Sequence, residues 1–371
     1  MGQKMNAHPL LFFSFLLSFF ALCINRCFFE NYFVLSFFLI EWMGKELDAM
    51  TTKDKVLQLL KKTPDFLSGE KLAQQLEVSR TSIWKAIKEL EKAGYRFEHG
   101  PTGYRYLPSD VLDAKEIQQE LRSFIPDLKV QTMLTSESTM KDAKLAAAQG
   151  DSVSKLFVAD TQEQARGRFG RPFFAEPGRG IYMSLLLHPD KRFDELPQYT
   201  IIAASACVKA IESVTGRSAS IKWVNDIYMD GKKVCGILSE AVSDMESGRI
   251  SHIIIGIGLN FSVPQNHFPA DLQEKAISVF PDGQASVTRN QLISKIWQEL
   301  FTYLSHPEKA LDFYKEKSFV LGKTVSFNQK GTTYVGLAKE IGDHGELIVQ
   351  TNEQKMSLSS GEISLTSIRT Q

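Results

Sequence analysis

Three arginines stand close together in the segment ARGRFGR. The cations are Arg166, Arg168 and Arg171, and they are separated by Gly167 and Gly170. Glycine lets the backbone approach a ligand closely, and arginine presents forked donors to phosphate or carboxylate oxygens. The two glycines disfavour a single helical face, so the spacing predicts an anion-binding loop. A solvated surface loop is the alternative interpretation.

A second basic segment follows about fifty residues later. The motif KWVND supplies Asn225 and Asp226, and the run KKVCGILSE after it contains Lys233. An amide can hold a base or a carbonyl group, and a carboxylate can hold Mg²⁺. Lys233 opens a strand-like run, so we expect its ammonium at a strand mouth, although it could be a surface lysine. Together with the arginine loop, this segment predicts a site for a phosphorylated nucleotide beside a second acidic group.

Other catalytic signatures are missing from the sequence. GIGLN at 256–260 lacks the third glycine of a dinucleotide-binding motif, and no GKS/T, GxSxG or HExxH occurs. His188, His252 and His267 are scattered and are typical of packing or surface positions. SEST at 136–139 offers two hydroxyls after a strand, or simply a helix cap. The sequence also contains no convincing catalytic triad.

Composition bounds the class of protein. With 371 residues and 43% apolar content, the chain can form two or three domains with real cores. Lysine plus arginine equals aspartate plus glutamate, 43 each, so the net charge indicates no partner. Four scattered cysteines form neither a disulfide framework nor a CxxC metal site, which favours a reducing, cytoplasmic location.

Residues 1–49 differ from the rest. They contain two phenylalanine-rich apolar runs, each shorter than the ~20 residues that span a bilayer. GKELDAM can be encoded with a purine-rich ribosome-binding sequence just ahead of Met50. We therefore expect translation to start at Met50 and residues 1–49 to be a start-site artefact. A membrane anchor and a signal peptide are the alternatives.

Residues 51–108 are predicted to form a winged helix-turn-helix. Two amphipathic helices and a turn precede YRFEHGPTGYRYL, which alternates like a hairpin. Residues 51–110 carry 11 Lys+Arg against 8 Asp+Glu, an excess that suits phosphate contacts. A small helical cap is the alternative. The expected DNA-contacting residues share the start and outer face of the second helix: Ser79, Arg80, Thr81, Trp84, Lys85 and Lys88.

The rest of the chain reads as α+β. A linker helix is expected at 108–124, and residues 125–317 alternate apolar strands with helical runs, including one at 290–316. Residues 318–371 contain short alternating strands with turns and predict a small all-β barrel.

In their order, these motifs resemble those of bifunctional biotin protein ligases, also called biotin operon repressors. The resemblance covers essentially all of 51–371 and rests on the winged helix, RGRxGR, KWxND, KxxGILxE and GxGxN. It implies a class II synthetase-like central domain and an SH3-like C-terminal barrel. It also implies the substrates biotin and ATP, with Mg²⁺, and a biotin carboxyl carrier lysine as acceptor. Operator DNA and a homodimer are the other implied partners, and no membrane partner is expected.

The resemblance also implies roles for individual residues. Lys233 and Arg168 are the expected catalytic residues, and Asp226 is a candidate Mg²⁺ ligand. The expected biotin-binding residues are Ser138, Thr139, Met140, Gln162, Arg166, Gly167, Arg168 and Lys233. The expected nucleotide-binding residues are Arg171, Phe173, Asn225 and Asp226. Ala165 and Val224 depart from the usual glycine and proline, but neither change removes a charged group.

Three rival functions remain at this point. A pure repressor that only senses a ligand needs no phosphate site, so the arginine loop with Lys233 disfavours it. A lipoate-type ligase resembles the central fold, but the winged helix and RGRFGR favour biotin. A membrane-anchored enzyme depends wholly on residues 1–49.

Overall fold

The computed structural model describes residues 51–365, apart from 151, 190, 193–195, 244–248, 330, 360 and 362. The predictions for residues 1–49 and for a start at Met50 therefore lie outside the described residues. The chain divides into two compact units between Ser109 and Asp110, each with its own helices and strands.

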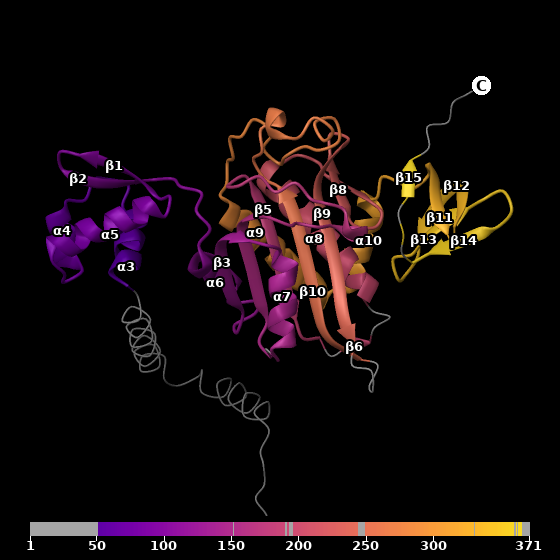
Figure 1. Ribbon diagram of the computed structural model, residues 1–371, viewed down its shortest axis with the longest axis horizontal. Helices are drawn as coiled ribbons and strands as arrows, with labels where there is room; N and C mark the ends of the chain where they lie inside the picture. The colour runs from indigo at the N-terminus through magenta and orange to yellow at the C-terminus, as the bar shows by residue number, and fades with distance from the viewer. Residues whose placement is uncertain are drawn as a thin grey trace, which may run out of the picture. The chain divides into compact units, whose positions relative to one another are not determined.

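The first unit is a winged helix-turn-helix, as predicted. Its elements are α3 (Thr52–Lys62), α4 (Gly69–Gln75), α5 (Arg80–Lys92) and the hairpin of β1 (Arg96–Gly100) and β2 (Gly103–Leu107) (Figure 1). Hydroxyl side chains cap the helices: Ser68 accepts from the amide of Lys71, and Ser79 accepts from that of Ser82. The apolar stripes of the three helices are buried against one another.

The second unit is built on a mixed sheet, in which the described residues form eight strands. Its order is β3-β4-β5-β10-β9-β8-β7, with β6 paired to β10. Among these strands, only β3 and β4 pair in parallel. The strands are β3 (Lys129–Ser136), β4 (Lys155–Gln162), β5 (Gly180–Leu187), β6 (Lys191–Arg192), β7 (Ser220–Lys222), β8 (Asp226–Met229), β9 (Lys232–Ser243) and β10 (Arg249–Asn260).

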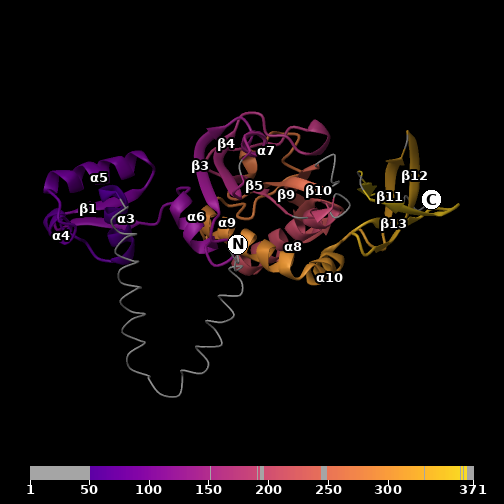
Figure 2. The ribbon, with the colours of Figure 1, turned by 90° about the horizontal axis from the view of Figure 1, so that it is seen from below.

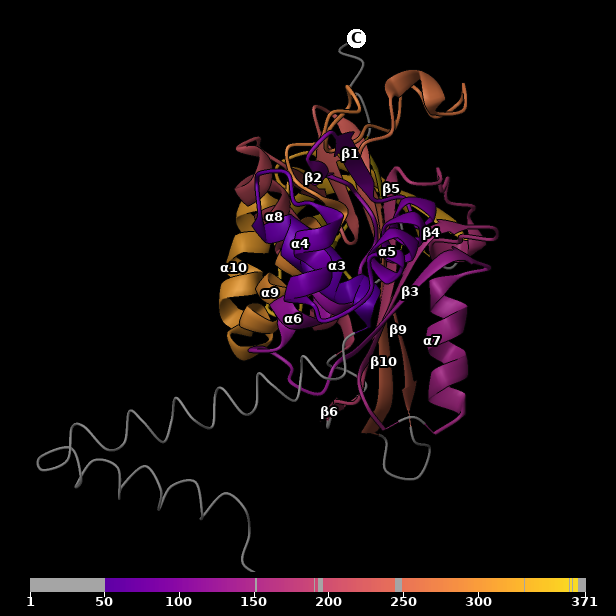
Figure 3. The ribbon, with the colours of Figure 1, turned by 90° about the vertical axis from the view of Figure 1, so that its left-hand side faces the viewer.

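Helices cover both faces of this sheet. Figure 3 shows α7 (Thr139–Ala148) on one face, and α8 (Leu196–Thr215), α9 (Arg289–Ser305) and α10 (Pro307–Lys317) on the opposite face. In the view from below, α9, α8 and α10 follow one another along that second face (Figure 2). Every residue of β5 is buried as a result, which explains its nearly continuous apolar sequence.

Two sequence-based helices were wrong in detail. The expected linker helix is α6 (Ala114–Leu121), and its Ile117 and Leu121 are fully buried in the core of the second unit. It belongs to that unit because its apolar stripe packs against the core. The run at 290–316 is two helices, because Pro307 lacks an amide donor and begins α10.

The C-terminal strands form an antiparallel sheet of order β14-β13-β12-β11-β15. They are β11 (Thr324–Gln329), β12 (Thr332–Ile341), β13 (Leu347–Gln350), β14 (Lys355–Leu358) and β15 (Ile363–Leu365). Their buried residues are continuous with the core of the central sheet. One polar link is the indole Nε1 of Trp223, which donates to the Gly345 carbonyl at 3.0 Å. Across the described part of the chain, no helix is long and apolar enough to cross a membrane.

Candidate functional site

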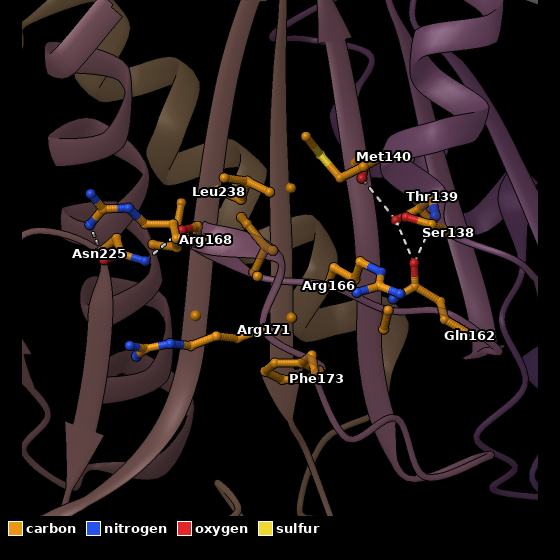
Figure 4. Close-up of a pocket in the computed structure, with 18 of the residues that line it drawn as sticks. Ser138, Thr139, Met140, Gln162, Arg166, Arg168, Arg171, Phe173, Asn225 and Leu238 are labelled. Atoms are coloured by element: carbon orange, nitrogen blue, oxygen red, sulfur yellow. Dashed lines mark hydrogen bonds between the residues drawn. The ribbon is translucent and has the colours of Figure 1, made fainter. Parts of the chain in front are cut away.

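All twelve residues that the sequence assigned to biotin or nucleotide line one cavity of about 220 Å³. They come from the start of α7, the end of β4, the arginine loop, and strands β8 and β9. Figure 4 shows Ser138, Thr139 and Gln162 on one side, with Arg168 and Asn225 on the other. Arg166 and Phe173 lie between them, and the Arg171 side chain extends toward the side of Arg168 and Asn225. The cavity therefore has a hydroxyl–amide end and a cationic end.

The hydroxyl–amide end is held by a small hydrogen-bond network. The Gln162 Oε1 accepts from the backbone N–H of Thr139 at 2.7 Å and from its hydroxyl at 3.2 Å. The Thr139 hydroxyl is also 2.8 Å from the Ser184 hydroxyl. Ser138 is the N-cap residue of α7, but its side chain makes no capping bond. The structure thus disfavours the simple helix-cap interpretation of SEST.

The arginine loop is a small hairpin closed by backbone hydrogen bonds. The Gly167 amide donates to the Arg171 carbonyl at 2.8 Å, and the Phe173 amide donates to the Ala165 carbonyl at 2.9 Å. At the tip, Phe169 has φ 58° and is 70% exposed. The segment is a loop, as its glycines predicted, and Arg166, Arg168 and Arg171 line the cavity.

Lys233 forms the centre of the cationic end. Its Nζ lies 2.7 Å from the Asp226 Oδ1. Its backbone is fixed on both sides, because its amide donates to the Lys275 carbonyl and its carbonyl accepts from the Ile277 amide. The side chain is 35% exposed, so an anionic ligand can reach the ammonium.

Asn225 connects this end to the arginine loop. Its Oδ1 accepts from the Arg168 Nη1 at 3.0 Å, and its Nδ2 donates to the Ile237 carbonyl at 2.8 Å. Nearby, the Tyr314 hydroxyl donates to the Val224 carbonyl at 2.9 Å. Burial, and secondarily the charge of Asp226, raise the pKa of Tyr314 well above its ordinary value. Tyr314 is therefore a neutral donor that fixes the KWVND turn.

Sequence reasoning did not assign the glycines under the cavity. A Cβ on Gly256 would meet the thioether of Met140, and a Cβ on Gly258 would meet the Phe173 ring. A Cβ on Gly236 would lie 3.3 Å from the Lys233 Nζ. These glycines let three cavity side chains lie flat on the sheet. Small residues inside apolar strands were the available signal, as was Ser184 in its apolar run.

The expected DNA face of the first unit is exposed. Trp84 is 53% exposed, and Arg80 and Thr81 share a hollow of about 520 Å³ with it and with hairpin residues. Lys88 pairs with Glu91 at 2.8 Å, and the Glu91 carboxylate also contacts His99 of the hairpin at 2.6 Å. The hydrogen bond from Lys88, and then that from His99, lower the pKa of Glu91. Glu91 thus connects α5 to the hairpin.

These features define a class of protein: a mixed α/β domain with a cation-lined cavity, preceded in the chain by a winged helix-turn-helix. Known families match in the same order. The HTH domain model matches residues 52–105, the Biotin/lipoate A/B protein ligase family matches 133–260, and the Biotin protein ligase C terminal domain matches 320–366.

Relatives of known function are similar along most of the chain. The bifunctional ligase/repressor BirA of Bacillus subtilis (strain 168) is 34% identical over 310 residues, which cover 81% of this chain and 94% of that protein. The protein of the same name in Escherichia coli (strain K12) is 26% identical over 82% of this chain and 94% of its own length. The biotin protein ligase from Aquifex aeolicus in complex with biotin and ATP superposes with a TM-score of 0.54, at 26% identity over 64% of this chain and 98% of that one.

The chain therefore belongs to the biotin protein ligase family, in its bifunctional ligase/repressor branch.

Proposed function

We propose that this chain joins biotin to ATP, giving biotinyl-5′-adenylate and pyrophosphate, and then transfers biotin to a carrier-protein lysine. The biotin and ATP of the Aquifex aeolicus complex support the substrates. The observation that carries the residue assignments is a single cavity with two chemically different ends. A neutral hydrogen-bonding ring suits the hydroxyl–amide end, and a carboxylate beside phosphate suits the cationic end.

We assign the biotin ureido ring to Ser138, Thr139 and Gln162. Hydroxyl and amide groups provide both donors and acceptors for a urea, and no charge is needed there. Met140 lies flat over Gly256 and supplies apolar contact to the rest of the ligand. At the other end, Arg166, Gly167 and Arg168 face the biotin carboxylate and the α-phosphate.

The first step brings two anions together. A carboxylate oxygen attacks the α-phosphorus of ATP, the new O–P bond forms, and pyrophosphate leaves. Lys233 and Arg168 offset the charge that builds up between carboxylate and phosphate, which is the kind of stabilisation this step needs. Holding both substrates in one cavity supplies up to about 7–11 kcal/mol of the barrier by alignment.

The nucleotide belongs on the side of Arg171, Phe173, Asn225 and Asp226. Mg²⁺ is commonly held by one or two carboxylates plus substrate phosphates, so Asp226 fits as its single protein carboxylate. The described residues offer no group of three or more His, Cys, Asp or Glu side chains for a metal. Bound Mg²⁺ would neutralise phosphate charge there.

In the second step the acceptor lysine of a biotin carboxyl carrier domain attacks the carbonyl of the mixed anhydride as a neutral amine. The amide bond forms and AMP leaves. Lys233 and Arg168 remain placed to stabilise the departing phosphate. No protein nucleophile is required, which agrees with the absence of a triad in the sequence.

The winged helix implies a second function, repression of biotin genes. We propose that the adenylate-bound chain forms a homodimer, so that two winged helices meet two half-sites of a palindromic operator. Trp84, Lys85 and Lys88 would read the major groove, with Ser79, Arg80 and Thr81 at the start of the helix. A cytoplasmic location is part of this proposal, since carrier, ATP and operator are all there.

A labelling assay tests the enzymatic part. The full chain is incubated with ATP, Mg²⁺ and a biotin carboxyl carrier domain, with either biotin or lipoate. Biotin-dependent, ATP-dependent labelling of the carrier is expected, together with pyrophosphate release. Labelling by lipoate alone, or pyrophosphate release without biotin, would contradict the proposal.

A further inference from the structure

We propose that the buried guanidinium of Arg289 is a positioning group, which couples the start of the second unit to the biotin end of the cavity. The inference rests on the proposed function, because it concerns Gln162 as a biotin-side residue. Arg289 begins α9, far in sequence from both groups that it joins, and its side chain is only 3% exposed.

One arm of Arg289 holds Asp110, the first residue of the second unit. The Arg289 Nε donates to the Asp110 Oδ2 at 2.9 Å, and its backbone amide donates to the Oδ1 at 2.8 Å. The Nη2 also donates to the Asp110 carbonyl at 3.0 Å. Both the side chain and the backbone of Asp110 are therefore fixed by one residue.

The other arm reaches the strands beneath the biotin end. The Arg289 Nη1 donates to the Asp160 Oδ1 at 2.7 Å and, at 3.4 Å, to the carbonyl of Gly180. Asp160 stands two residues before Gln162 in β4, and Gly180 begins the neighbouring strand β5. A shift of Asp160 would therefore move the Gln162 side chain. The Oε1 of that side chain accepts the hydrogen bond from the Thr139 backbone N–H at 2.7 Å.

The next residue of α9, Asn290, binds the residues that follow Asp110. We call the contacts of Arg289 and Asn290 with residues 110–113 the clamp. The Asn290 Nδ2 donates to the Val111 carbonyl at 2.9 Å, and its Oδ1 accepts from the Asp113 amide at 3.2 Å. Asn290 is itself buried. Residues 110–113 are thus held at three positions by Arg289 and Asn290, directly after the winged-helix unit ends at Ser109.

Charge explains why the two arms cannot act independently. One cation is shared by two carboxylates, and a buried guanidinium that loses a partner leaves an uncompensated charge. Loss of the Asp110 arm therefore draws the guanidinium toward Asp160 and disturbs β4. By linkage, biotin bound beside Gln162 must in turn stabilise the clamped form of residues 110–113.

Biotin affinity of the full-length chain tests the coupling. Asp110→Asn removes the charged arm but keeps the side-chain shape, and calorimetry should show biotin binding weakened by about five- to tenfold. Asp113→Asn is the matched control. It makes the same change three residues later, at the N-cap of α6, where asparagine caps as well as aspartate. Its biotin dissociation constant should stay within about twofold of wild type.

Hydrogen exchange separates coupling from a merely structural role. In the wild type, biotin should slow exchange of the Asp113 amide, which donates to Asn290. In Asp160→Asn this response to biotin should be lost even where the folded protein still binds biotin at saturating concentration. If Asp110→Asn does not fold, Asp110→Glu, which keeps the charge and lengthens the arm, replaces it in the same comparison.

The outcomes are distinguishable. A lower melting temperature in Asp110→Asn, with biotin affinity equal to that of Asp113→Asn, would show that the clamp only stabilises the fold. An unchanged exchange response in Asp160→Asn would overturn the coupling as well. Failure of the wild type itself to bind biotin would overturn the proposed function, and this inference with it, before any variant is compared.

Discussion

Lys233 is the side chain on which the proposed chemistry depends most directly. Replacing it with alanine removes a positioned cation from the point where carboxylate and phosphate meet, so adenylate formation should fall by about 10²–10³-fold. Its neighbour Lys232 is the matched control, because its Nζ donates to the Gln273 carbonyl outside the cavity. Pyrophosphate release measures both variants, and equal losses in the two would show that Lys233 has no special role.

Arg168 allows a different test at the same scale. Its Nη1 donates to the Asn225 side chain, so Arg168→Ala should remove the hydrogen bond that links the arginine loop to Asn225. We expect weaker retention of the adenylate without unfolding, measured by how fast labelled adenylate dissociates. Asn225→Asp offers the reverse test, because an added charge would hold Arg168 more firmly but repel phosphate. Wild-type retention in Arg168→Ala would show that its assignment is wrong.

His252 should make the folded chain sensitive to acid. Burial, and then the nearby His188 whose ring centroid is 5.0 Å away, lower the pKa of His252 below its ordinary 6.5. As the pH falls below 6.5, the unfolded chain takes up a proton that the folded chain resists, so the free energy of unfolding decreases. Urea unfolding at neutral and acidic pH should show a smaller decrease in His252→Asn. An identical pH dependence in that variant would contradict the interpretation.

The hairpin loop and the strand beneath it act together through Gly258. A Cβ at this position would come within 3.0–3.3 Å of the Phe173 ring, so Gly258→Ala should displace the ring and weaken nucleotide binding more than biotin binding. Phe173→Ala removes the clash, so the two changes should be strongly non-additive in a double-mutant cycle. Simple additivity in ATP affinity would show that the ring does not lie over this strand in solution.

Elements also show how far sequence reasoning reached. The central strands were predicted in outline from apolar runs that alternate with helical ones, and the loop from its glycines. The edge strand β7 and its neighbour β8 were not predicted, because three or four residues around KWVND carry no periodicity. The linker helix was placed wrongly, since an amphipathic stripe does not reveal which core it packs against. Likewise, Arg289 looks like an ordinary helix-start residue in the sequence, because nothing there indicates its two distant carboxylates.

The two units should be separable by function at the scale of the whole molecule. Trp84→Ala removes the exposed aromatic group of α5, so operator binding should weaken by about an order of magnitude, measured by footprinting with biotin and ATP present. Carrier labelling should be unchanged. Leu145→Ala is the control, because Leu145 is equally exposed, at 53%, but lies on α7. Equal footprints for Trp84→Ala and wild type would leave the winged helix without its proposed role.

The hydrogen bond from Trp223 to Gly345 has a consequence for the order in which a nascent chain matures. The winged-helix unit ends at Ser109. The KWVND turn, in contrast, is held by Gly345, which is made roughly 240 residues after Ser109. At about 5–20 residues per second, synthesis of that stretch takes roughly 10–50 s. The winged helix-turn-helix of a nascent chain is therefore complete on the ribosome well before Gly345 is made and the Trp223–Gly345 hydrogen bond can form. During that interval, any operator contact would be made by a chain that cannot yet hold the adenylate signal.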